Sequence, residues 1–212
     1  MQQQHVQQRN VSFALLTRAE VLCNTWRRVY TKVLQILQSL DNNIAQKLAT
    51  KESNAMLNAH EVNKSRLIFE QTINTENLIE DLQSTLKLLK EVCDDWEQLE
   101  SDASRHMNKS LKEPVSRKPV SLSTSSLIDV TSVSPTDVHG FIANLSSQHL
   151  EEYNSKRVLF AELSSYLSNE EMFRNLLNEL NTNSFIDEAI EKELKERVQL
   201  YKTVKKVLES VD

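Results

Sequence analysis

Glycine and proline are almost missing from this chain of 212 residues, which contains one Gly and three Pro. Sheet connections, tight turns and phosphate-binding loops depend on these two residue types, because glycine adopts backbone conformations that other residues avoid and proline presets a turn. Walker and Rossmann phosphate loops need several glycines each, so the sequence excludes both. A chain this poor in both residue types is predicted to be helical.

Aromatic residues are also scarce, at 6%, whereas charged residues make up 26% of the chain. A core must therefore be built mainly from Leu, Ile and Val, and the high charge is typical of long helices whose outer faces stay in water. The formal net charge is −5. A general nucleic-acid binder needs a basic face, so we expect no direct contact with nucleic acid.

The chain has only two cysteines, Cys23 and Cys93, which lie far apart and form no metal-ligand pair in sequence. Cys93 falls on an apolar stripe, which predicts a buried, reduced thiol of the kind found in intracellular proteins. The first ten residues, MQQQHVQQRN, lack the apolar core of a signal peptide. Uninterrupted apolar runs such as FALL at 13–16 are too short to span a membrane. We expect a soluble protein of the cytosol or the nucleus, with no membrane segment.

Two long segments carry apolar residues at alternating spacings of three and four, which is the repeat of a coiled coil. In 11–50 the repeat comprises Leu15, Ala19, Leu22, Trp26, Val29, Val33, Ile36 and Leu40. In 62–107 it includes Ile79, Leu82, Leu86, Leu89, Cys93 and Trp96. The polar stretch 50–65 predicts a break between them. The pattern therefore predicts a long helical hairpin over 11–107, preceded by a disordered N-terminus over 1–10.

Residues 108–137 interrupt the helical pattern, because all three prolines and many Ser and Thr lie there. This composition predicts a flexible linker. It contains Ser134-Pro135, the minimal site of a proline-directed kinase, so Ser134 is a candidate phosphorylation site. Thr136 and Asp137 are predicted to cap the helix that follows.

The C-terminal part, 138–212, is predicted to form helices that pack on the hairpin or on a partner. We expect one helix over 137–167, a short one over 168–180 opened by a capping box of Ser168 and Glu171, and a last one over 184–211. The predicted fold class is all-α. The chain is expected to be an elongated coiled coil or helical bundle of two long helices, a Ser/Thr/Pro linker and two to three further helices.

Narrow apolar stripes do not close a core alone, so each long helix is expected to need a partner along its length. We therefore predict a heteromeric complex with a small helical subunit. The predicted partner-binding seams comprise Leu22, Trp26, Val29, Val33, Leu82, Leu86, Leu89 and Trp96. Trp26 and Trp96 are the only tryptophans, and core packing is favoured over a functional aromatic pocket for both.

Catalytic signatures are missing from the sequence. There is no Gly-x-Ser-x-Gly elbow, and no histidine follows a glutamate by three residues as a di-iron helix bundle requires. His149 and Glu152 could contact one metal ion, but the sequence offers no set of remaining ligands nearby. We expect a protein that is not an enzyme and that has no cofactor and no metal.

The stretch Lys156-Arg157-Val158-Leu159-Phe160 permits two interpretations. As an extended peptide it matches docking signals for a cyclin groove and for the sheet edge of a phosphatase, with Arg157, Val158, Leu159 and Phe160 as the contacts. As part of 149–167 it belongs to a helix that contains no breaker. Docking would require that helix to unwind, so a helical core segment is favoured.

Two stretches resemble the family of cyclin-dependent kinase 2-interacting protein. IEDLQSTLKLLKEVCDDWEQLE at 79–100 is similar to that family's central helix, and LEEYNSKRVLFAELSSYLS at 150–168 is similar to a later helix. Trp26 falls where the family carries a tryptophan near the start of its first helix. The resemblance implies a non-enzymatic nuclear adaptor of the cell cycle. It would be linked to replication-associated kinases, to DNA-damage and genome-maintenance signalling, and to a complex of paired AAA ATPases in ribosome maturation.

The same heptads are equally typical of a structural subunit in another coiled-coil assembly. A kinetochore, spindle or vesicle-tethering complex would use long helices of this kind. The alternative function is therefore a structural role in such a complex. Only the resemblance distinguishes the adaptor from this alternative.

Overall fold

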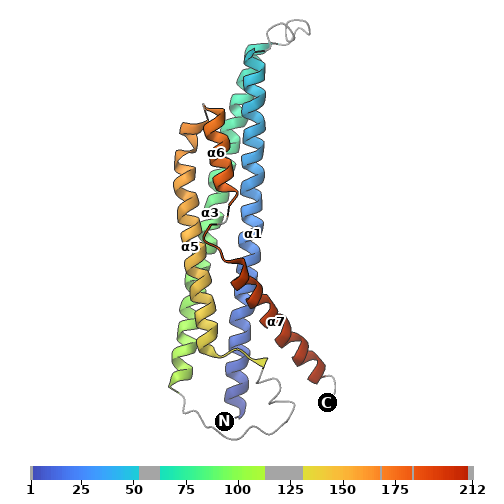
Figure 1. Ribbon diagram of the computed structural model, residues 1–212, viewed down its shortest axis with the longest axis vertical. Coiled ribbons are helices and arrows are strands. Elements are labelled where there is room, and N and C mark those ends of the chain that lie inside the picture. The colour runs from blue at the N-terminus through green and yellow to red at the C-terminus, as the bar shows by residue number, and fades with distance from the viewer. Residues whose placement is uncertain (1, 53–62, 113–130, 168, 183, 210–212) are drawn as a thin grey trace. The chain divides into compact units, whose positions relative to one another are not determined.

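Every secondary-structure element in the described residues is a helix (Figure 1). The computed structural model describes residues 2–52, 63–112, 131–167, 169–182 and 184–209. The helices within these ranges are α1 (Gln2–Glu52), α3 (Lys64–Leu111), α5 (Pro135–Tyr166), α6 (Glu170–Leu180) and α7 (Glu188–Glu209). None of these described helices combines the length and apolarity that a membrane crossing requires. The prediction of an all-α helical bundle is confirmed.

The two long helices are longer than the apolar repeats within them. Helix α1 already begins at Gln2, whereas the sequence predicted disorder over 1–10. Glutamine and arginine favour helix, and extending an existing helix gains one hydrogen bond for each residue added. Helix α3 likewise continues to Leu111. The predicted break over 50–65 corresponds to the interval between the two helices, of which 53–62 lies outside the described residues.

Helix α5 begins within the predicted linker, of which 113–130 lies outside the described residues. Its first residue is Pro135, which suits the first position of a helix because that position needs no backbone donor. Ser134 Oγ accepts a hydrogen bond from the backbone N–H of Asp137 at 3.1 Å and donates one to the Asp137 carboxylate at 2.8 Å. Ser134 is therefore the N-cap, and the prediction that Thr136 and Asp137 cap this helix was wrong in register.

Helix α6 also has a polar cap. The side chain of Asn169 accepts a hydrogen bond from the backbone N–H of Met172 at 3.1 Å. Asn169 is therefore the N-cap of α6. The predicted cap, Ser168, is one residue earlier and lies outside the described residues. Asparagine and serine cap equally well, so the pattern located the turn and missed the register by one residue.

The chain divides into two compact units that do not follow the predicted division into hairpin, linker and C-terminal helices. The first unit comprises Met1–Thr25, Val92–Glu151 and Phe185–Asp212, and the second comprises Trp26–Glu91 and Glu152–Ser184. Helices α1, α3 and α5 each contribute one segment to each unit, while α7 belongs to the first and α6 to the second. Sequence contiguity could not reveal this division, because one uninterrupted helix can supply apolar residues to two cores.

The core of the first unit brings together residues from four helices. In this unit α1 and α3 run antiparallel, since Arg18 on α1 pairs with Asp102 on α3 at 2.8 Å and Ser12 lies 3.0 Å from His106. Its buried apolar side chains include Leu15, Leu16, Ala19, Cys23, Val92, Cys93, Trp96, Leu99, Ala103, Val138, Ile142, Leu145, Leu194, Val198 and Tyr201.

The core of the second unit combines α1 and α3 with α6 and the end of α5. Its buried apolar side chains are Trp26, Tyr30, Val33, Ile36, Leu37, Leu40, Ile44, Leu82, Leu89, Leu163, Phe173, Leu176 and Leu180.

In the second unit, a layer of polar side chains between α1 and α3 replaces the apolar contacts. The Asn43 amide donates to the Gln71 carbonyl oxygen and to the Thr75 hydroxyl, both at 2.8 Å. The Gln71 amide in turn donates to the Thr50 hydroxyl at 3.0 Å. Such a layer favours one register of the two helices, because any slip leaves buried polar groups unpaired.

Candidate functional site

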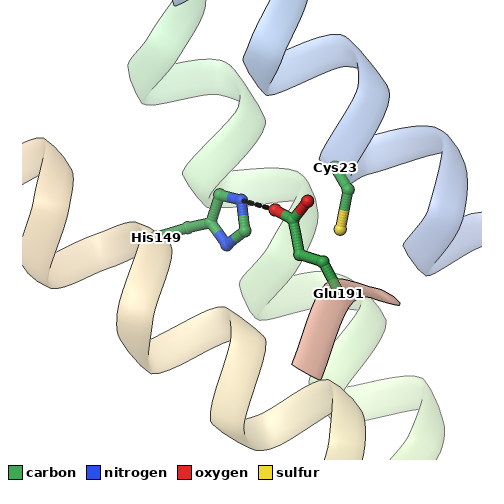
Figure 2. A group of neighbouring side chains, drawn as sticks. All are labelled: Cys23, His149 and Glu191. Carbon is green, nitrogen blue, oxygen red and sulfur yellow. Dashed lines mark ion pairs between the residues drawn. The ribbon is translucent and has the colours of Figure 1, made fainter. Parts of the chain in front are cut away.

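A buried cluster of three chemically different side chains lies in the first unit (Figure 2). Cys23 comes from α1, His149 from α5 and Glu191 from α7, and their exposed fractions are 0%, 0% and 4%. The Cys23 sulfur, a His149 ring nitrogen and a Glu191 carboxylate oxygen all lie within 4.8 Å of one another. The Glu191 carboxylate lies between the imidazole and the thiol (Figure 2). Thiolate, imidazole and carboxylate are the three side-chain ligand types that zinc accepts.

The orientation of the His149 ring follows from its own helix. The Nδ1 atom lies 2.8 Å from the carbonyl oxygen of Leu145, one turn earlier in α5. A carbonyl oxygen only accepts hydrogen bonds, so Nδ1 carries the proton and Nε2 is directed at Glu191, whose carboxylate oxygen is 3.8 Å away. The Trp96 ring packs against the imidazole with centroids 5.0 Å apart. Backbone and aromatic contacts therefore hold Nε2 toward the cluster.

The burial of Cys23 limits the chemistry that this cluster can perform. A cysteine nucleophile must reach a substrate, whereas Cys23 has no exposed surface. Three buried ligand atoms can instead surround a metal ion or form a polar cluster within the core. Glu191 lies in the first turn of α7, where the positive end of the helix dipole stabilises a carboxylate.

Sequence reasoning found one member of this cluster and assigned it the wrong partner. His149 was paired with Glu152, but Glu152 forms an ion pair with Lys156 at 3.0 Å. Cys23 and Glu191 were not considered as ligands, because no local spacing connects three residues on three helices. The sequence did contain one indication: Glu191 lies three residues before Leu194 on the apolar face of the last helix, where a charged residue is unusual.

No protein-family model matches this chain, and no curated protein matches it. The similarity of 79–100 and 150–168 to the family of cyclin-dependent kinase 2-interacting protein therefore stays a prediction.

A second buried polar cluster lies in the second unit and joins α5 to the end of α6. Lys156 and Glu152 are 2% and 0% exposed. The Lys156 ammonium donates to the carbonyl oxygens of Glu179 at 3.3 Å and Leu180 at 3.2 Å, and also to that of Thr182. It therefore caps the C-terminus of α6, where unpaired carbonyls and the negative end of the helix dipole favour a cation.

Tyr30 completes this cluster from α1. Its hydroxyl donates to the carbonyl oxygen of Leu180, and its ring lies 5.5 Å from the Lys156 ammonium. Burial, together with the negative charge of Glu152, raises the pKa of Tyr30 above its ordinary value. The phenol is therefore held in its neutral form, in which it can donate this hydrogen bond.

The predicted partner-binding seams lie mostly inside the chain itself. Trp26, Val33, Leu82, Leu89 and Trp96 are buried, and Leu22, Val29 and Leu86 are half-buried. The apolar repeats do mark buried faces, but helices of the same chain cover them. The physical reason is that α5, α6 and α7 supply the apolar surface that the sequence analysis assigned to a separate subunit. Both tryptophans pack in these cores: Trp26 stacks on Tyr30, with ring centroids 6.4 Å apart.

The candidate docking motif is helical throughout. Arg157, Val158, Leu159 and Phe160 all belong to α5. Arg157 and Val158 are exposed, whereas Leu159 and Phe160 are half-buried. A groove that binds extended peptides could receive this segment only after this part of α5 unwinds. Ser134, the candidate phosphorylation site, is exposed, but its hydroxyl already serves as the N-cap of α5.

One apolar pair of the second unit faces solvent. Phe69 and Ile73 on α3 are 63% and 40% exposed, and they lie four residues apart on one helix face. Gln71 between them is buried and points to α1, so the pair lies on the side of α3 away from α1. In this region α1 and α3 extend past the ends of α5 and α6 (Figure 1). We call this surface the outer face of α3.

Proposed function

We propose that this chain is a non-enzymatic adaptor that binds other proteins through helical surfaces. The observation that carries this proposal is the outer face of α3, where a phenylalanine that is 63% exposed stands beside an exposed isoleucine. Single exposed apolar residues are common, whereas two large neighbouring ones on one helix face offer an apolar patch that another protein can cover.

The partner is expected to be an amphipathic helix. A helix that packs on α3 would place apolar residues at spacings of three and four against Phe69 and Ile73. The exposed carboxylates of Glu76 and Glu80 follow on the same side of α3. They favour a partner with basic residues flanking its apolar stripe, since complementary charge guides orientation and association.

The cellular setting is proposed from the sequence resemblance alone. The stretches 79–100 and 150–168 support a nuclear adaptor linked to replication-associated kinases and genome maintenance, or to a paired AAA-ATPase complex of ribosome maturation. The small helical subunit expected in such a complex is a candidate for the helix on α3. A structural role in a kinetochore, spindle or tethering complex would use the same surface with different partners.

The test is affinity purification of the full chain from cells that naturally make it, with quantitative mass spectrometry of stoichiometric partners. The double variant Phe69→Lys with Ile73→Lys should lose the principal partner. Burying a phenylalanine or isoleucine contributes about 1.5–3 kcal/mol each, so affinity should fall at least about tenfold. The matched control is Leu200→Lys on α7, which alters a side chain that is 53% exposed and outside this surface.

Three outcomes are informative. Loss of one helical partner in the α3 double variant, with retention in the Leu200→Lys control, supports the adaptor. Retention of every partner in the double variant contradicts the role of the outer face of α3. Arg157→Ala provides the competing test, because Arg157 is exposed and its loss leaves the core intact. If Arg157→Ala alone releases a cyclin or a phosphatase, the docking interpretation replaces this one.

A further inference from the structure

We propose that Cys23, His149 and Glu191 form a structural zinc site that joins α1, α5 and α7 within the first unit. The three side chains come from three helices and meet at one buried point (Figure 2). The proposal is independent of the adaptor function, since it concerns how the first unit is held together.

The separations among the ligand atoms are close to those of a metal site. Zinc binds sulfur at about 2.3 Å and nitrogen or oxygen at about 2.0–2.2 Å, so tetrahedral ligands lie roughly 3.3–3.8 Å from one another. The His149 nitrogen and the Glu191 oxygen are 3.8 Å apart, and no pair among the three ligand atoms exceeds 4.8 Å. Side-chain shifts of about 1 Å would close the set around an ion, without movement of the helices.

The chemical character of the ligands selects the metal. A thiolate excludes magnesium and calcium, which prefer oxygen ligands, whereas the imidazole and carboxylate suit a borderline ion such as Zn²⁺. Charge also balances: one thiolate and one carboxylate offset the two positive charges of the ion, and the imidazole stays neutral. A neutral set matters here, because all three side chains are shielded from water.

The surroundings of His149 provide a second, independent indication. Zinc-bound histidines commonly donate their other ring N–H to a carbonyl or a carboxylate, which fixes the tautomer and aims the ligand nitrogen. His149 does this through Nδ1 and the Leu145 carbonyl at 2.8 Å. The two oxygens of one carboxylate lie too close together to fill two tetrahedral positions, so the fourth ligand would be a water molecule.

The effect on the fold would be largest at α7. Leu194, Val198 and Tyr201 anchor this helix in the core of the first unit, and Glu191 lies one turn before them. A metal bond to Glu191 would secure the first turn of α7 to Cys23 on α1 and to His149 on α5. Binding would therefore stabilise the folded first unit, by a free energy that grows with the logarithm of the free metal concentration once this exceeds the dissociation constant.

The experiment is metal analysis of the full chain, purified without chelators, followed by reconstitution of the stripped protein with Zn²⁺ and with Co²⁺. We expect one zinc per chain. The cobalt form should show the absorption bands of a tetrahedral ion and a thiolate-to-cobalt charge-transfer band. Zinc should raise the melting temperature of the stripped protein.

The variants distinguish this site from adventitious binding. Cys23→Ser and the isosteric Glu191→Gln should each weaken zinc binding by more than about 100-fold. Substitutions of residues that only hydrogen-bond to metal ligands typically weaken binding by about 10- to 100-fold, so a larger loss indicates a direct ligand. The matched control is Cys93→Ser, which removes the other buried thiol and keeps a donor near the His149 carbonyl oxygen, 3.7 Å from the sulfur. Circular dichroism of each variant establishes that its helices form.

Stoichiometric zinc that is lost in Cys23→Ser and retained in Cys93→Ser supports the site. A wild-type chain that binds neither Zn²⁺ nor Co²⁺ after reconstitution overturns it without reference to any variant. Zinc binding that survives both Cys23→Ser and Glu191→Gln also overturns it, because the ion then lies elsewhere.

Discussion

Replacing Lys156 by methionine is expected to destabilise the second unit strongly. Methionine is unbranched like lysine but ends one atom earlier and has no charge, so Glu152 is left as a buried carboxylate without the ammonium that lies 3.0 Å from it. The carbonyls of Glu179 and Leu180 at the end of α6 lose the same donor. One substitution thus removes the cation beside a buried carboxylate and a donor from two carbonyl oxygens at the end of α6.

The magnitude follows from the burial of both partners. Lys156 is 2% exposed and Glu152 is 0% exposed, so water does not replace the lost partner. Removing one member of a buried ion pair costs about 3–5 kcal/mol. For a chain of this size each kcal/mol lowers the melting temperature by roughly 2–4 °C, so Lys156→Met should lower it by about 6–20 °C.

The assay is chemical denaturation followed by circular dichroism, combined with hydrogen exchange of α6. The amides of α6 should exchange faster in Lys156→Met, because the helix has lost its C-terminal cation. The control is Lys202→Met, in which the lysine is 45% exposed and lies 3.8 Å from Glu20. An exposed pair contributes at most about 1 kcal/mol, so this variant should remain close to wild type.

A second substitution tests the physical reason. Glu152→Leu in the Lys156→Met background removes the carboxylate that has lost its ammonium partner. A well-packed apolar pair can replace a buried ion pair with little net change in the free energy of unfolding. The double variant should recover at least about 2 kcal/mol, and the remaining loss reflects the hydrogen bonds to the α6 carbonyls. If Lys156→Met costs less than about 1 kcal/mol, or if the double variant is no more stable than the single one, the buried pair is not what stabilises this end of α6.

Three further predictions concern single groups. Because the pKa of Tyr30 is raised in the folded state, the stabilisation by Tyr30 is complete at pH values below its ordinary pKa of 10.0 and declines as the pH rises above 10.0. In thermal melts from about pH 8 to pH 11, the melting temperature should therefore fall less with rising pH in Tyr30→Phe than in the wild type. The hydrogen bond from Arg18 lowers the pKa of Asp102, so this carboxylate stabilises the fold above pH 3.8 and loses its effect as the pH falls below that value. Urea unfolding should find Asp102→Asn less stable by about 0.5–1 kcal/mol at pH 7 and equal to wild type at strongly acidic pH. Ser134→Ala should cost about 1 kcal/mol and Ser134→Asp almost nothing, since aspartate is an equally good N-cap; an unchanged denaturation midpoint in Ser134→Ala would contradict the capping role.

The helical class of this protein was predictable because its indicators are local. The shortage of glycine and proline and the repeat of three and four residues act within one or two turns, and neither depends on what lies across the interface. The same reasoning located the buried positions of Trp26, Val33, Leu89 and Trp96. It also favoured helix over an extended motif at 156–160, where α5 is continuous.

The largest error of the sequence-based predictions concerned contacts between helices. The repeats identified buried faces and could not say whether α5, α6 and α7 or another protein would cover them. The predicted capping residues of α5 lie two and three positions too late and that of α6 one position too early, because serine, threonine, asparagine and aspartate compete for the same role over adjacent positions. The disorder predicted over 1–10 was wrong for 2–10 because helix propagates from a stable segment at little cost.

The amino-acid sequence by itself determined that the chain is helical, where its long helices lie and which of their faces are apolar. These properties follow from backbone hydrogen bonds and side-chain periodicity within single helices. Only the tertiary structure decided that Lys156 caps α6, and that Cys23, His149 and Glu191 meet in one cluster. Apolar stripes are compatible with several helix registers, and the register alone determines which polar side chains face one another across the core.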